Sequence, residues 1–149
     1  MKKGTLLLIS SILWLTISLY GQCPDRYTLL KRITDLRDSL KLSDKEQLSI
    51  LLPFADSLNA CGDKYDTIHA FLYKRLGALY YNEADYSNSL LYYRQFVNML
   101  AESPYKSGAA TKYLMGGYYW LSVIYDSMGM ENEKWKALDD CIDIAEKIN

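Results

Sequence analysis

Apolar residues recur every three or four positions along most of the chain after residue 25, and this spacing constrains the fold more than any other feature of the sequence. In the first such stretch, residues 26–41, the recurring residues are Leu29, Leu30, Ile33, Leu36 and Leu40. A period near 3.6 places them on one face of an α-helix, whereas a half-buried strand would show strict alternation. The sequence has no convincing stretch of alternation and therefore predicts an all-α fold.

Turn and cap signals divide the chain into six expected helices. Their ranges are residues 26–41, 44–60, 64–81, 86–102, 106–128 and 131–147. Ser43 and Glu46 predict a capping box at the start of the second helix, and Gly129 predicts the end of the fifth. Pro53 predicts a kink or a break in the second helix, because proline removes a helical hydrogen bond.

Short connections between these helices predict three antiparallel hairpins, stacked as an α-solenoid. The expected hairpins cover about residues 26–60, 64–102 and 107–147. Together they make a single helical-repeat domain over residues 22–149, which is an ordinary size for one domain.

The first 21 residues carry a different signal and are expected to lie outside the fold. Two lysines form a basic start, residues 5–20 form an apolar run, and Gly21 is a small residue at its end. This order is typical of a secretory signal peptide, and the run is short for a transmembrane helix. We expect cleavage near Gly21 or Gln22 and export to the periplasm or cell surface. Two alternatives stay open, an uncleaved leader that anchors the chain in the membrane and a lipid-modified Cys23, although Gln22 fits a lipoprotein signal poorly.

Composition and charge exclude several classes of protein. Half of the residues are hydrophobic and 23% are charged, which favours a globular domain over a disordered chain. Loss of Lys2 and Lys3 with the leader leaves 15 basic and 18 acidic residues. The resulting net charge of −3, without any basic run, argues against a nucleic-acid partner.

Residues that commonly carry catalysis or bind metals are sparse. The chain has one histidine, His69, and three cysteines, Cys23, Cys61 and Cys141, whose spacing matches no metal-ligand pattern. Asp66 precedes His69 by about one helical turn, but no nucleophilic residue lies at a spacing from this pair that would indicate a catalytic site. We therefore predict no enzyme, no cofactor and no metal site. An enzyme that depends on Cys61 or His69 is the weaker alternative.

Two stretches in the second half of the chain share one pattern. Their matched residues are Tyr73, Leu76, Gly77, Tyr80, Leu90, Tyr93 and Phe96 in the first, and Tyr118, Leu121, Ser122, Tyr125, Trp135, Leu138 and Cys141 in the second. Residues 80–93 read YYNEADYSNSLLYY, close to the Y-x-x-x-G-D-Y-x-x-A-L-x-Y-Y of the tetratricopeptide repeat (TPR). Over about residues 64–149 the chain therefore resembles the TPR family, which implies a superhelix of helical hairpins.

The same comparison shows departures from the family. Gly77 and Ser122 keep the small residue that lets neighbouring helices approach closely, but Ser89 and Lys134 replace the family's alanine. The two units lie 45 residues apart, whereas the family repeats every ~34 residues. We therefore expect an irregular pitch. The tyrosines expected in the core between helices are Tyr73, Tyr80, Tyr93, Tyr118 and Tyr125.

The resemblance also implies a function, because the first helices of TPR hairpins line a concave groove that holds a partner. The positions that map to this groove are Phe71, Lys74, Tyr81, Asn82, Tyr119 and Asp126. Aromatic side chains with a polar tip are favoured at protein interfaces. We therefore predict an exported scaffold that binds a peptide or a partner protein. The alternative is the N-terminal sensor or assembly region of a membrane-tethered system, since exported TPR proteins of Bacteroidota can continue into signalling or CHAT-type protease domains.

Overall fold

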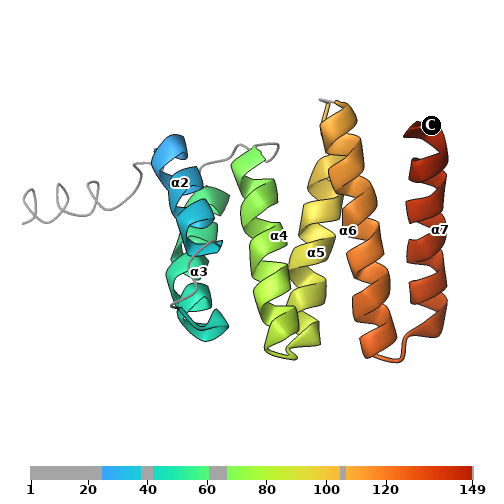
Figure 1. Cartoon of the computed structure of the whole chain (residues 1–149), viewed down its shortest axis with the longest axis horizontal. Coiled ribbons are helices and arrows are strands. Elements are labelled where there is room, and N and C mark those ends of the chain that lie inside the picture. The colour runs from blue at the N-terminus through green and yellow to red at the C-terminus, as the bar shows by residue number, and fades with distance from the viewer. Residues whose placement is uncertain (1–24, 38–41, 61–66, 105–106, 149) are drawn as a thin grey trace, which may run out of the picture.

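The computed structural model describes residues 25–37, 42–60, 67–104 and 107–148, and these residues form an all-α structure of six helices. The helices are α2 (Arg26–Arg37), α3 (Asp44–Ala60), α4 (Thr67–Asn82), α5 (Tyr86–Glu102), α6 (Gly108–Ser127) and α7 (Glu131–Ile148). They stand side by side in one row, with α2 and α3 at one end and α7 at the other (Figure 1). The predicted all-α class is therefore confirmed.

Helices that are consecutive in sequence pack against one another from α3 to α7, and α2 also packs against α4. The observed helix boundaries agree closely with the predicted ones. The expected leader, the end of the first helix at residues 38–41 and the start of the third at residues 64–66 lie outside the described residues. In the part of the chain that is described, no helix has both the length and the apolar character needed to cross a membrane.

Side chains at the start of α3 form the predicted capping box. The backbone N–H of Ser43 donates to Glu46 Oε2 at 2.8 Å, and the backbone N–H of Glu46 donates to Ser43 Oγ at 3.4 Å. These bonds pair polar groups that a helix start leaves without intrahelical partners. The helix begins at Asp44, directly after the capping serine.

Pro53 lies inside α3 without ending it, so of the predicted kink or break the break is absent. Proline removes the hydrogen bond that would reach the carbonyl of Ser49, one turn earlier. Pro53 and Ser49 are both exposed and lie on the solvent side of the helix. Water can therefore reach the carbonyl that lost its partner, and α3 continues to Ala60.

The buried side chains form two groups of different chemistry. The aliphatic core joins α2, α3 and α4 and consists of Leu29, Ile33, Leu36, Leu48, Leu51, Ala55, Leu58, Ile68, Leu72, Leu76 and Leu79. The aromatic core joins α4, α5, α6 and α7 and consists of Ala70, Tyr73, Leu90, Tyr93, Phe96, Val97, Leu121, Ile124, Tyr125 and Ala137. Helix α4 therefore contributes one face to each core.

All five tyrosines predicted to lie between helices pack against these cores. Tyr73, Tyr93 and Tyr125 are buried, and Tyr80 and Tyr118 are half-buried beside the core residues. Burial raises the pKa of the Tyr93 hydroxyl, because the charged form would lose its hydration.

Small residues allow close approach within the aromatic core. A Cβ atom added at Gly77 would lie 2.6 Å from Cδ2 of the Tyr93 ring, so this position tolerates no side chain unless the Tyr93 ring shifts. Ser89 on α5 is fully buried, and its Oγ donates to the carbonyl of Gly77 at 2.8 Å. The predicted close approach at Gly77 is thus confirmed, and the buried Ser89 hydroxyl is not left unpaired.

The α4–α5 turn and the α6–α7 turn each contain one residue in the left-handed backbone conformation. Gly129, between α6 and α7, has φ +71°, in agreement with its predicted role. Ala84, between α4 and α5, has φ 57°. Glycine adopts this conformation freely, whereas a residue with a Cβ atom is strained there by about 1–2 kcal/mol. The α4–α5 turn therefore stores strain that the α6–α7 turn avoids.

Candidate functional site

Two adjoining hollows form a groove across α2, α4 and α6, the first helices of the three successive pairs. One has a volume of about 350 Å³ and lies between α2, α4 and one side chain of α6, and the other, of about 430 Å³, lies along α6 beside α4. Both hollows share Lys74 and Tyr113 in their walls. The residues that line the groove are Leu30, Ile33 and Thr34 on α2, Phe71, Lys74, Arg75 and Ala78 on α4, and Ala109, Lys112, Tyr113, Gly116 and Trp120 on α6.

Aromatic and cationic contacts between α4 and α6 form the centre of the groove. The Phe71 ring meets the Tyr113 ring edge to face, with 5.5 Å between ring centroids. Lys74 Nζ lies 5.3 Å from the centroid of the same Tyr113 ring, within the range of a cation–π interaction. Tyr113 is thus held from two directions in the wall that the hollows share.

The α2 side of the groove is apolar. Leu30 and Ile33 lie one helical turn apart and face α4, and Ile33 is buried in the aliphatic core. The Thr34 hydroxyl already has a hydrogen-bond partner within α2, because its Oγ1 donates to the carbonyl of Leu30 at 2.9 Å. An apolar side chain of a ligand would therefore meet a hydrophobic wall here rather than polar groups in need of partners.

The described walls of the groove carry positive charge. Lys74, Arg75 and Lys112 line it, and among the described residues no Asp or Glu lines either hollow. Arg75 is oriented by Gln47 of α3, whose side-chain carbonyl accepts a hydrogen bond from its guanidinium. Cationic side chains in such a hollow attract negatively charged ligands, since the partly apolar walls reduce screening by water.

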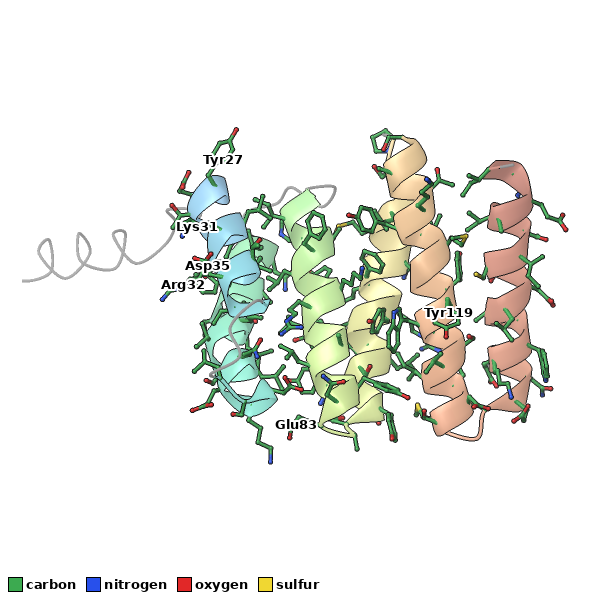
Figure 2. The ribbon with its side chains drawn as sticks, in the orientation of Figure 1. Tyr27, Lys31, Arg32, Asp35, Glu83 and Tyr119 are labelled. Atoms are coloured by element: carbon green, nitrogen blue, oxygen red, sulfur yellow. The ribbon has the colours of Figure 1, made fainter. Side chains whose placement is uncertain are left out.

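Two exposed cations of α2, Lys31 and Arg32, lie elsewhere. Lys31 and Arg32 are on the side of α2 that is turned away from α4, next to Asp35 (Figure 2). Lys31 Nζ forms an ion pair with Asp35 Oδ2 at 2.8 Å, and Arg32 lies over the ring of Phe54, 5.6 Å from its centroid. These two cations therefore add little to the charge inside the groove.

Of the six residues predicted to line a groove, Phe71 and Lys74 line this one. Tyr81 lies half-buried beside it, where its ring meets Trp120 edge to face at 5.6 Å and its hydroxyl lies 3.3 Å from Ser127 Oγ. Because Trp120 lines the groove, Tyr81 supports the wall from behind. Asn82 lies at the end of α4 and donates from Nδ2 to Asp44 Oδ2 at 2.8 Å, which ties α4 to the start of α3.

The two predicted residues on α6 lie outside the hollows. Tyr119 is 52% exposed on the surface of α6 (Figure 2), and its ring meets Trp120 at 6.2 Å. Asp126 accepts a hydrogen bond from Lys134 Nζ at 2.7 Å and so links α6 to the start of α7. This hydrogen bond raises the pKa of Lys134, because it stabilises the charged ammonium.

Sequence reasoning missed the α2 wall and most of the α6 wall. Mapping by repeat distance pointed to Tyr119, but the α6 residue opposite Phe71 and Lys74 is Tyr113. Which residues face each other depends on how far two helices are displaced along their axes, and an alignment of repeats does not supply that displacement. The sequence does contain a pattern that indicates the α6 wall. Tyr113 and Trp120 are separated by two helical turns, and Gly116 lies between them on the same face of the helix.

Two residues of types that commonly carry catalysis, His69 and Cys141, lie in the described part of the chain. His69 is 4% exposed, its Nδ1 has no hydrogen-bond partner, and its ring lies 6.2 Å from that of Tyr73. Cys141 is a free thiol whose pKa is raised by burial, which disfavours the reactive thiolate. Within the described ranges, no three His, Cys, Asp or Glu residues are grouped so that they could hold a metal ion. Cys23, Cys61 and Asp66 lie outside those ranges.

No protein-family model matches the chain, and no curated protein or solved structure matches it significantly. The resemblance to the TPR family therefore depends on the residue pattern and on the packing described above.

Proposed function

We propose that the chain is a TPR-like helical-repeat module that binds a segment of a partner protein in the groove across α2, α4 and α6. The observation that carries this proposal is the position of the groove. It lies on the first helix of each successive pair, which is where a TPR superhelix presents its concave face. The helices stand side by side in one row (Figure 1). Helices arranged side by side in this way offer an extended surface to a partner.

Details of the packing support the TPR-like assignment. Gly77 and Ser89 let α4 and α5 approach closely, and left-handed turn residues at Ala84 and Gly129 close the two hairpins that follow the repeat pattern. Gly77 and Gly129 are positions at which the sequence resembles the family, whereas Ser89 and Ala84 stand where the family has alanine and glycine.

The lining of the groove suggests the chemistry of the bound segment. Lys74 and Lys112 complement carboxylates, while Leu30, Phe71 and Tyr113 complement an apolar or aromatic side chain. The proposed ligand is therefore an extended segment that carries acidic residues around an apolar anchor. Exposed Tyr119 and half-buried Tyr81 border this surface and extend it along α6.

Export is part of the proposal and follows from the N-terminal leader. A basic start followed by a short apolar run places the folded part of the chain in the periplasm or at the cell surface. Cell fractionation combined with the mass of the mature N-terminus tests this point. Cytosolic protein with an intact, unanchored leader would contradict it.

Panning a random peptide library on the purified protein tests the groove. We expect enriched peptides with acidic and apolar residues. Their affinity should fall at least ~10-fold in the Lys74→Glu/Lys112→Glu variant, since each ~1.4 kcal/mol lost is a factor of ten. The matched control, Lys136→Glu/Lys147→Glu, changes the same net charge on exposed residues of α7 and should keep the affinity. Equal losses in both variants, or no enriched peptide, would overturn the proposed function.

A further inference from the structure

Helix α7 carries an exposed apolar strip that the groove does not explain. Trp135 is 58% exposed and Ile142 is 53% exposed, and half-buried Leu138 and Ala145 continue the same line. These four residues are spaced by three, four and three positions, so they share one face of the helix. We call them the α7 strip.

The packing of α7 leaves this strip uncovered in the described structure. Helix α7 packs against α6, and Ala137 is its only fully buried residue. Its place at the end of the row leaves no described helix on its far side (Figure 1). Large exposed apolar side chains grouped in this way mark interaction surfaces more often than isolated ones do.

Carboxylates border the strip on one side. Asp139, Asp143 and Glu146 repeat with helical spacing next to Ile142, and in the described part of the chain none of the three forms an ion pair. Helix α7 as a whole has six acidic and three basic residues. One of its cations, Lys134, is already paired with Asp126 and Glu131. The border of the strip is therefore negative, and a second copy would bring another negative border to it.

We propose that the α7 strip binds a partner helix that is amphipathic and basic along one border. The apolar face of such a helix covers Trp135, Leu138 and Ile142, and its lysines or arginines meet Asp139, Asp143 and Glu146. Two helices that pack side by side bury both apolar faces, while the bordering charges fix orientation and partner choice. The inference does not depend on the groove, because it involves a different helix and the opposite charge.

Two synthetic helices test the proposal on the purified full-length protein. Both are about five turns long and share one leucine face, and one carries lysines along its border while the other carries glutamates. Fluorescence anisotropy of a labelled helix measures the affinity. We expect the lysine helix to bind at least ~10-fold more tightly than the glutamate helix. This difference should shrink when NaCl is raised from about 50 to about 500 mM, because salt screens exposed charges.

Charge reversal makes the test independent of folding defects. The Asp139→Lys/Asp143→Lys variant should prefer the glutamate helix, which an unfolded protein cannot do. The control Glu102→Lys/Glu133→Lys changes the net charge equally at two exposed carboxylates and should keep the preference for lysine. Trp135→Ser should weaken binding of either helix. Equal affinity for both helices, or the same reversal in the control, would overturn the proposal. So would sedimentation that shows self-association lost on Trp135→Ser, because the strip would then bind a second copy.

Discussion

The two cores of this protein fill the space between helices with different kinds of side chain. In the aliphatic core, leucine and isoleucine from α2, α3 and α4 fill space without polar groups that need partners. In the aromatic core, Tyr73 and Tyr125 bring hydroxyl groups into the interior, and each has a partner, Asn59 for Tyr73 and Arg94 for Tyr125. Helix spacing there is set by residues that lack a side chain, above all Gly77 and Gly117.

The difference between the two cores shows where the structure depends most strictly on the identity of individual residues. Aliphatic side chains of similar volume can replace one another at modest cost, so the aliphatic core depends mainly on filled volume. Aromatic rings seated against glycine backbone depend on close approach at named positions. The groove lies where these two cores adjoin, because α4 belongs to both and presents Phe71 and Lys74 between them.

Loss of volume in the aliphatic core should have the largest effect. Leu72 is fully buried, so Leu72→Ala is expected to lower the free energy of unfolding by about 2–5 kcal/mol through lost burial and a residual cavity. Urea denaturation measures this change. Near-UV circular dichroism of the folded variant, which reports aromatic packing, should stay close to that of the wild type. A collapse of the near-UV signal under native conditions would show that the two cores are not distinct.

Added volume in the aromatic core should have the next largest effect. A Cβ atom at Gly117 would lie 2.6 Å from Val97 Cγ2 and 3.0 Å from Phe96 Cε1, so Gly117→Ala should destabilise the protein by about 1–3 kcal/mol through overpacking. Gly116→Ala is the matched control, because a Cβ at Gly116 has no neighbour within 4 Å. The control should be neutral or slightly stabilising, since alanine favours helix. Similar losses of thermal stability in both variants would contradict the close approach.

The two turns that border the aromatic core should respond in opposite directions. Ala84→Gly relieves left-handed strain and is expected to raise the free energy of unfolding by ~0.5 kcal/mol, the relief less the added freedom of the unfolded chain. Gly129→Ala introduces that strain and should lower it by ~1 kcal/mol. The midpoint of urea denaturation reports both changes when its slope is unchanged. A shift of the same sign in both variants would show that the turns are not equivalent.

The smallest expected effect is electrostatic and belongs to the aliphatic half. Hydrogen bonds from the Ser43 hydroxyl and backbone N–H lower the pKa of the Glu46 carboxyl below its ordinary value. A lowered folded-state pKa contributes stability above the unfolded value, and that contribution is lost as the pH falls through the folded value. The stability difference between wild type and Glu46→Gln should therefore be constant near neutrality and should narrow below about pH 4.5. A difference that persists unchanged at pH 2 would contradict the capping role.

Helix positions could be read from the sequence because their signals are local. Apolar spacing, the Ser43 and Glu46 pair and Gly129 each act within a few residues, and the structure places the helices accordingly. At Pro53 the sequence predicted a kink or a break, and the break is absent because α3 runs through Pro53 to Ala60. The sequence pattern did not show that Ser49, whose carbonyl loses its partner, faces solvent. Tyr113 and Trp120 were missed as groove residues because their position opposite α4 depends on the packing of helices far apart in sequence.

Photo-crosslinking in the producing cell tests the central claim, that the groove holds a partner. A photoreactive amino acid is placed either at Lys112, which lines the groove, or at Lys136, which is exposed on α7. The account predicts one discrete protein adduct at Lys112, lost on Lys74→Glu, and no such adduct at Lys136. The same adduct from both positions, or an adduct at Lys112 that is unaffected by Lys74→Glu, would contradict it.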